Sequence, residues 1–284
     1  MSSAGSREST GVARAGDFQV RSDVGFYICL SVLGGTYLLL IVAMLVAEAS
    51  YTTPGDLLSA LDSPEIRFAM GMSLISCSVT TVLSLLVAVP VGYLMSRLRF
   101  PGKNIVDAVL DIPIVLPPLV IGLSLLILFQ TPMGRFFEEH VFTVTYAFPS
   151  IILAQFMVAC AFAVRTMRVT FDQINPRREQ VALTLGCTRN QAFWAVVLPE
   201  ARRGMLTAGT LAWARSLGEF GPILIFSGAT RLRTEVLPTT IFLEMSVGKL
   251  EAAVAVSLIM VLAALVVLVV ARMFGLGAAG NRLL

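Results

Sequence analysis

Histidine is almost absent from this 284-residue chain, in which His140 stands alone. The four cysteines are not spaced as metal ligands, and three of them fall in apolar segments, so we expect small core residues rather than disulfides or ligands. They are Cys29, Cys77, Cys160 and Cys187. No grouping of histidine, serine and carboxylates suggests a catalytic site, and no metal site is expected. The chain also lacks a glycine-rich loop that ends in lysine, so it cannot itself hydrolyse ATP.

Charged residues are equally scarce. They make up 14% of the chain, hydrophobic residues make up 56%, and the mean hydropathy is +0.83, whereas soluble domains have about 25% charged residues. A membrane-spanning helix needs roughly 20 apolar residues. Six stretches qualify, at about 25–48, 68–96, 105–129, 149–167, 204–227 and 251–274. The sequence therefore predicts an all-α integral membrane protein with six transmembrane helices.

The six stretches leave no room for a second globular domain. Residues 1–24 contain no apolar run and many Ser, Gly and Arg residues, which predicts a disordered tail. Residues 25–284 then form one transmembrane domain. The first apolar stretch begins too late and is too long for a cleaved signal peptide, so we expect a retained helix.

Basic residues favour the cytoplasmic side of a membrane, and they alternate along this chain. They occupy the N-terminal tail and the second-to-third and fourth-to-fifth connections, whereas the other connections are rich in acids such as Glu65, Glu138 and Glu139. This pattern predicts that both termini are cytoplasmic. The small positive charge is then a topology signal, since no basic patch with interleaved aromatic residues indicates nucleic-acid binding.

A polar, basic stretch at about 170–203 separates two apolar segments and carries a distinctive spacing. The residues that carry it are Glu179, Gln180, Val181, Ala182, Gly186, Leu198 and Pro199. The stretch resembles the cytoplasmic EAA loop of bacterial ABC-importer permeases, although Gln180 and Val181 replace the usual Glu and first Ala, and Glu179 lies one place early. The resemblance implies that the loop docks on an ATPase subunit that binds ATP and magnesium. The alternative is an ordinary amphipathic segment at the membrane surface.

Local signals predict the shape of this loop. Pro176 suits the start of a short helix over 179–185, and Gly186 suits its end and a sharp turn. A second short helix over 189–197 then leads to Pro199. The apolar side chains of Leu183, Leu185 and Phe193 could enter a groove of a partner protein.

The third apolar segment contains Pro113, Pro117 and Pro118 shortly after Asp111. Prolines remove amide donors and clash with the preceding turn, so this helix should kink or break. Broken helices near the membrane midplane often line substrate paths; the alternative is a kink that serves packing only. The Leu-Pro-Pro sequence also resembles a segment of molybdate and sulfate permeases, which implies a translocation path near these residues.

The fifth apolar segment contains Arg215 and Glu219 within the string Arg-Ser-Leu-Gly-Glu-Phe-Gly-Pro. Charges inside a membrane segment are costly and often functional. A spacing of four lets the two side chains pair on one helix face, either as a structural ion pair or as the lining of an anion path. The string resembles the same oxyanion permeases, and an Arg233-Thr234-x-x-Leu237-Pro238 pattern follows in a connection expected to face outward.

Three matching motifs in the same order identify the chain as similar to the molybdate, tungstate and sulfate group of type I ABC-importer permeases. The resemblance implies a homodimer in the inner membrane of a bacterium or archaeon, two ATPase subunits, an extracytoplasmic oxyanion-binding protein and no cofactor in the chain itself. Molybdate is the first candidate substrate, and tungstate or sulfate are alternatives. A permease for ferric ion or polyamine, or a secondary transporter that needs no ATPase, remains open. Glycines in the apolar segments are expected at close helix contacts, namely Gly34, Gly71, Gly92, Gly122 and Gly209.

Overall fold

The computed structural model describes residues 24–280, except for the side chains of residues 271, 272 and 274–280. Every regular element within the described residues is helical, which confirms the all-α prediction. The tail predicted to be disordered, at residues 1–24, lies almost entirely outside the described residues.

The chain divides into two compact units, residues 1–47 and 48–284. The described part of the first unit is most of helix α1 (Val24–Ser50), which has apolar residues on all sides. Such a helix suits an environment of lipid or other membrane helices. By length and composition it can cross a bilayer, as the first apolar stretch predicts.

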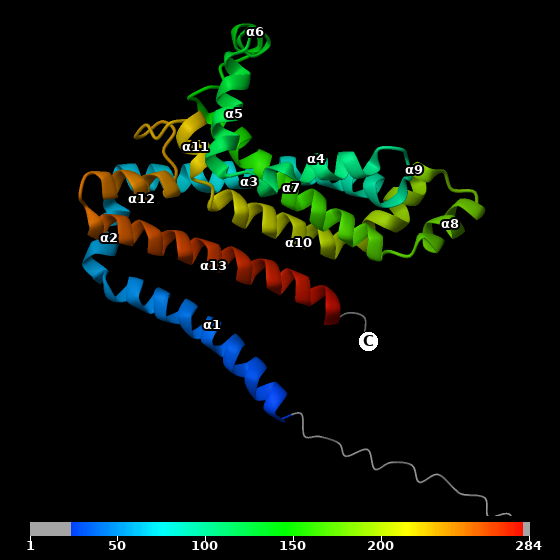
Figure 1. The fold of residues 1–284 in the computed structure, drawn as a ribbon, viewed down its shortest axis with the longest axis horizontal. Coiled ribbons are helices and arrows are strands. Elements are labelled where there is room, and N and C mark those ends of the chain that lie inside the picture. Colours follow the sequence, from blue (N-terminus) through cyan, green and yellow to red (C-terminus); the bar gives the residue numbers. More distant parts are fainter. Residues whose placement is uncertain (1–23, 281–284) are drawn as a thin grey trace, which may run out of the picture. The chain divides into compact units, whose positions relative to one another are not determined.

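The second unit is built on four long helices that run alongside one another (Figure 1). They are α3 (Pro64–Arg97), α7 (Phe148–Gln173), α10 (Leu198–Leu217) and α13 (Leu250–Gly280). Helix α3 packs along α7, α10 packs on both, and α13 covers α10. At one end lie α2 (Pro54–Asp62) and α12 (Leu237–Ser246), and at the other lie α8 (Pro176–Thr184) and α9 (Arg189–Ala192).

Small residues let these helices approach closely. A Cβ on Gly92 of α3 would lie 2.8 Å from the Cβ of Met167 on α7, and one on Gly209 would lie 3.2 Å from Leu85. These positions confirm the expected close contacts. The same expectation was wrong for Gly71, since a Cβ there would have no neighbour within 4 Å. Gly34 lies in the first unit, and its expected contact stays a prediction.

Two of the four cysteines behave as expected. Cys77 and Cys160 are buried in the helix core, whereas Cys29 is exposed and Cys187 is half-buried. No disulfide joins these four residues.

Four of the expected crossings are single helices that are long and apolar enough to span a membrane: α1, α3, α7 and residues 250–270 of α13. The third segment forms α4 (Lys103–Val115) and α5 (Pro118–Gln130), which together pass the same criterion but are bent by 110°. Helix α5 points away from the long bundle and leads to α6 (Pro132–His140) (Figure 1).

The segment at 204–227 is not one continuous helix. Helix α10 ends at Leu217, and a short helix α11 (Gly221–Phe226) begins after three residues. Pro222 lies at the start of α11 and cannot continue α10, because it lacks an amide donor and clashes with the preceding turn. The expected single span therefore becomes a helix, a break and a second helix.

Candidate functional site

A buried ion pair lies at the break between α10 and α11. Arg215 Nη2 is 2.6 Å from Glu219 Oε1; the carboxylate side chain is 1% exposed and the arginine side chain is 30% exposed. The guanidinium carbon also lies 5.8 Å from the ring centroid of Phe162 on α7. A buried carboxylate is costly unless it is paired, so Glu219 depends on Arg215. The guanidinium remains accessible enough to meet a second anion.

Buried polar side chains connect the three long helices beside this pair. Gln155 on α7 donates its amide to the carbonyl of Ser216 on α10 at 3.2 Å and accepts a hydrogen bond from Thr80 on α3 at 3.1 Å. All three residues are at most 1% exposed. A satisfied buried network fixes the helices in one arrangement. The sequence reasoning missed Gln155, although an uncharged amide within the apolar segment 149–167 could have indicated it.

The proline segment breaks the third apolar stretch as predicted. Helix α4 ends at Val115, Leu116 and Pro117 are extended, and Pro118 occupies the first turn of α5. Pro113 is accommodated within α4. The bend of 110° turns α5 away from α4.

The proline break and the ion-pair segment meet in the fold. A Cβ on Gly122 of α5 would lie 2.8 Å from the Cα and carbonyl oxygen of Pro222 on α11. In return, a Cβ on Gly221 would lie 3.1 Å from the nitrogen of Leu119 and 3.2 Å from Pro118. The two motifs therefore form one tight contact, the α5–α11 junction, which directly follows Glu219 in the chain.

Asp111, which the sequence placed with the prolines, pairs elsewhere. Its carboxylate lies 2.7 Å from Arg165 on α7, and the side chains of this pair are 38% and 63% exposed. Asp107 forms a second pair with Arg168. Both pairs join α4 to α7, and the structure gives Asp111 no contact with Arg215 or Glu219.

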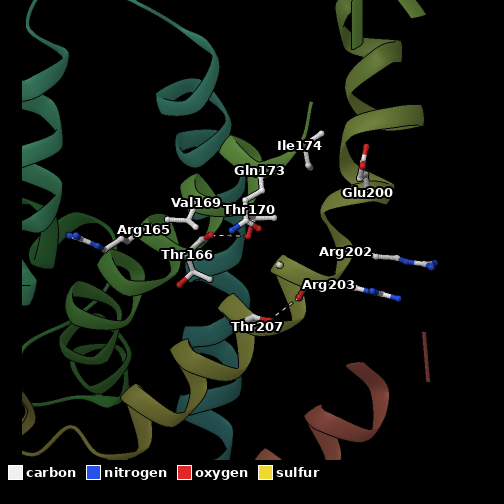
Figure 2. A pocket seen from close by; sticks show the side chains of 11 residues that line it. Arg165, Thr166, Val169, Thr170, Gln173, Ile174, Glu200, Arg202, Arg203 and Thr207 are labelled. Carbon is white, nitrogen blue, oxygen red and sulfur yellow. Dashed lines mark hydrogen bonds between the residues drawn. The ribbon is translucent and has the colours of Figure 1, made fainter. Parts of the chain in front are cut away.

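A basic groove of about 630 Å³ lies between α7 and the first half of α10. In Figure 2, Arg202 and Arg203 extend side by side from α10, and Arg165 extends from α7 in the opposite direction. Glu200 also lines the groove and pairs with Arg178. In the sequence these basic residues indicate only the orientation in the membrane, and no sequence pattern indicated the groove.

The loop at 170–203 has the predicted shape. The side chain of Asn175 accepts a hydrogen bond from the amide of Arg177 and caps α8, in which Pro176 is the first residue. Helix α8 is followed by Gly186 at φ +91°, a left-handed conformation that favours glycine. Helix α9 and the π-helical turn η1 (Phe193–Val197) then lead into α10.

The loop exposes apolar side chains, but they are not all the expected ones. Leu185 is 79% exposed, and Trp194, which the sequence analysis missed, is 63% exposed. Phe193 was wrongly expected to be free for a partner: its ring packs against Tyr93 with centroids 4.9 Å apart. Of the other expected docking residues, the exposed ones are Gln180, Val181, Gly186 and Pro199, the half-buried ones are Glu179, Leu183 and Leu198, and the buried one is Ala182.

The motif at residues 233–238, at the α2–α12 end of the second unit, is mostly buried. Arg231 contacts Glu235 at 3.5 Å and Glu244 at 2.7 Å. Burial raises the pKa of Glu235, against the opposing effects of a hydrogen bond from Thr240 and the charge of Arg231. Within the expected outward motif, Thr234 and Leu237 are buried, Pro238 is half-buried and Arg233 is exposed. Within the described residues, no group of three or more His, Cys, Asp or Glu side chains is placed to hold a metal ion.

Comparison with known proteins gives one family. The family model described as "Binding-protein-dependent transport system inner membrane component" matches residues 88–277. This match includes the α4–α5 break, the loop at 170–203 and the Arg215–Glu219 pair.

Curated relatives match over most of the chain. The sulfate transport system permease protein CysT of Salmonella typhimurium is 31% identical over 85% of this chain and 86% of its own length. The molybdenum transport system permease protein ModB of Mycobacterium tuberculosis is 34% identical over 73% of this chain and 80% of its own length. Among solved structures, a chain of a bacterial alginate ABC transporter in complex with an alginate pentasaccharide-bound periplasmic protein matches with a TM-score of 0.72 and 15% identity, over 88% of this chain and 93% of that chain. That match shows the shared fold.

Proposed function

The chain belongs to the binding-protein-dependent transport system inner membrane components and is a permease subunit of an ABC importer, and we propose that it moves a tetrahedral oxyanion across the membrane. Molybdate is the first candidate, with tungstate and sulfate as alternatives. The named substrates of the relatives support this class of anion. The Leu-Pro-Pro and Arg-x-Leu-Gly-Glu-Phe-Gly sequences, which resemble segments of such permeases, agree with it.

The buried Arg215–Glu219 pair is the observation that carries the proposal. A guanidinium held in a site of low dielectric attracts an anion more strongly than one in water. Glu219 fixes the arginine in place and opposes tight retention of the anion, and a transport path must bind weakly enough to release. The adjacent α5–α11 junction includes Pro118, and Pro117 directly precedes it. The junction links the position of the pair to the bend between α4 and α5.

The basic groove lies between the helices that carry Phe162 and Arg215, α7 and α10, and nearer to the α8–α9 end. Clefts lined by charges of one sign raise the local concentration of the opposite ion. Arg165, Arg202 and Arg203 line the groove, and Asp111 and Glu200 moderate its charge. An anion released from the pair would leave through this groove.

The exposed apolar side chains of the loop at 170–203 are the surface on which a separate ATPase subunit docks. Two copies of the permease and two ATPase subunits, which bind ATP and magnesium, would alternate access across the inner membrane. The α8–α9 end would face the cytoplasm, and the α2–α12 end would receive the extracytoplasmic binding protein. The N-terminus is cytoplasmic in this arrangement.

The test is reconstitution in proteoliposomes with the ATPase and binding protein that form a stable complex with this chain. Uptake of labelled molybdate should require ATP and should be inhibited by excess tungstate or sulfate. Competition by ferric ion or a polyamine instead would reassign the substrate. Uptake that persists without the ATPase would show a secondary transporter and overturn the proposal.

The orientation needs its own measurement. Single cysteines near Arg177 should react with impermeant thiol reagents only from the cytoplasmic side, and cysteines near Glu138 only from outside. A loop at 170–203 that is labelled from outside would refute the docking of an ATPase there.

A further inference from the structure

Glu179 turns away from the exposed face of its own helix. It lies in the first turn of α8, yet its side chain reaches α3, where Tyr93 donates its hydroxyl proton to Glu179 Oε1 at 2.6 Å. Arg97, one turn along α3, places its Nε 3.5 Å from Oε2. The side chains of Arg97 and Glu179 are each 14% exposed. This contact is a largely buried link between the loop and a membrane helix.

The two partners of Glu179 are themselves held in place. The ring of Tyr93 makes edge contacts with Phe171 of α7, at 5.6 Å between centroids, and with Phe193 of η1, at 4.9 Å. Besides this ion pair, Arg97 Nη2 donates a hydrogen bond, at 3.0 Å, to the carbonyl of Ile174, the residue that follows α7. Four elements, α3, α7, α8 and η1, therefore converge on one point.

The rest of α8 is held less firmly. Arg178 pairs with Glu200 at the start of α10, but the arginine side chain is 62% exposed. Val181 and Leu185 are exposed. Exposed ion pairs contribute little because solvent screens them, whereas a hydrogen bond to a buried charged group is stronger. Of the polar contacts that join α8 to the long helices within the described residues, the Glu179 contact is the more deeply buried one.

We propose that Glu179, Tyr93 and Arg97 form a latch through which a displacement of the docking loop moves α3. Glu179 is thus a positioning residue inside the permease rather than a contact to the ATPase. The inference rests on the proposed function, because it assumes that an ATPase displaces the loop. Without the latch, α8 would shift at Gly186 while α3 stays in place.

Helix α3 also connects the latch with the residues beside the Arg215–Glu219 pair. Helix α3 also carries Thr80, which is hydrogen-bonded to Gln155, and Gln155 is bonded to the residue after Arg215. A shift of α3 at Tyr93 therefore reaches the network beside the anion path along one continuous helix, in which Pro90 lies between Tyr93 and Thr80. The loop and the path are coupled through α3.

The experiment compares variants of the purified permease–ATPase complex in proteoliposomes. Tyr93→Phe removes one hydroxyl and keeps the aromatic packing, Glu179→Gln removes the charge, and the double variant tests whether the two residues act as one unit. Arg178→Gln is the matched control, since it removes an exposed charge from the same helix. The measured quantities are ATP hydrolysis, molybdate transported per ATP, and ATPase affinity for the permease.

For Tyr93→Phe we expect unchanged ATPase affinity and a roughly tenfold loss of anion moved per ATP, the factor that corresponds to one hydrogen bond to a charged group. The double variant should be no worse than Glu179→Gln, and Arg178→Gln should resemble the unmodified protein. Normal transport per ATP in Tyr93→Phe would overturn the latch. Weakened ATPase binding confined to Glu179→Gln would overturn it too and would make Glu179 a docking residue. Failure of the unmodified permease to bind any ATPase subunit would instead refute the proposed function.

Discussion

The α5–α11 junction and the loop at 170–203 use apolar residues and glycine in opposite ways. At the junction, Gly122 and Gly221 let two backbones touch, and the neighbouring Glu219 is almost fully buried. In the loop, Gly186 supplies a turn in open space, and Leu185 is largely exposed. One region is closed around a charge, and the other presents an apolar surface.

Under the proposed function, this difference follows from what each region would bind. A charge acts strongly on an anion only where water and mobile dipoles are excluded, so the ion pair needs dense packing around it. A docking surface gains free energy by burying apolar area that is exposed beforehand. Changes at the junction should therefore affect folding and transport, whereas changes in the loop should affect partner binding and leave the bundle intact.

The largest effect is expected from Arg215→Ala. It leaves Glu219 buried without a partner, and breaking a buried pair typically costs about 3–5 kcal/mol. Arg165→Ala is the matched control, because its exposed pair with Asp111 should contribute about 0–1 kcal/mol. Denaturant unfolding of the purified proteins measures both changes. Equal losses in the two variants would contradict the view that burial makes the first pair different.

Gly122→Ala should come next. The added Cβ would lie 2.8 Å from the backbone of Pro222, which cannot rotate away, and overpacking of this kind costs about 1–3 kcal/mol. Gly71→Ala in α3 is the control, because a Cβ there has no neighbour within 4 Å and alanine favours a helix by up to about 1 kcal/mol. The midpoints of thermal unfolding should move in opposite directions, and a shared direction would argue against a tight junction.

A smaller and more local effect is expected from Gly186→Val. The position has φ +91°, and a left-handed conformation costs a side-chain-bearing residue about 1–2 kcal/mol. The strain should distort the turn after α8, weaken ATPase binding and lower transport-linked hydrolysis, while thermal unfolding of the bundle stays close to that of the unmodified protein. Unchanged assembly with the ATPase would refute the docking role of this loop.

The smallest effect concerns pH and the α2–α12 end, which neither region includes. Burial raises the pKa of Glu235 above its ordinary value of 4.5, so the folded state holds this proton more tightly than the unfolded state. The contribution of Glu235 to stability should therefore decline as pH rises from about 4.5 through the raised pKa. Comparison of the unmodified protein with Glu235→Gln across this window isolates the effect, and Glu251→Gln is an exposed control. If the unmodified protein instead became more stable relative to Glu235→Gln as pH rises, the assigned direction would be contradicted.

The sequence was sufficient for local features that depend on neighbouring residues. Apolar runs located five of the six expected spans, counting the bent α4–α5 pair, and the prolines located its break. Pro176 and Gly186 marked the ends of α8. Each of these depends on backbone chemistry within a few residues.

Features that depend on distant residues were not predictable in the same way. Nothing in the sequence shows that Gly122 packs on Pro222, that Asp111 pairs with Arg165, or that Phe193 packs against Tyr93. The inward turn of Glu179 is of the same kind, since its partner lies 86 residues away along the chain. The break after Leu217 was missed because the apolar run continues through it, although Gly221-Pro222 indicated it.

Anion uptake by the double variant Arg215→Leu with Glu219→Leu tests the central claim most directly. The change removes both charges and leaves no unpaired group, so a permease in which the pair is only structural should fold and transport normally. We predict that the double variant assembles with its ATPase and hydrolyses ATP, but that molybdate uptake into proteoliposomes falls to the background level. Uptake equal to that of the unmodified complex would remove both residues from the anion path.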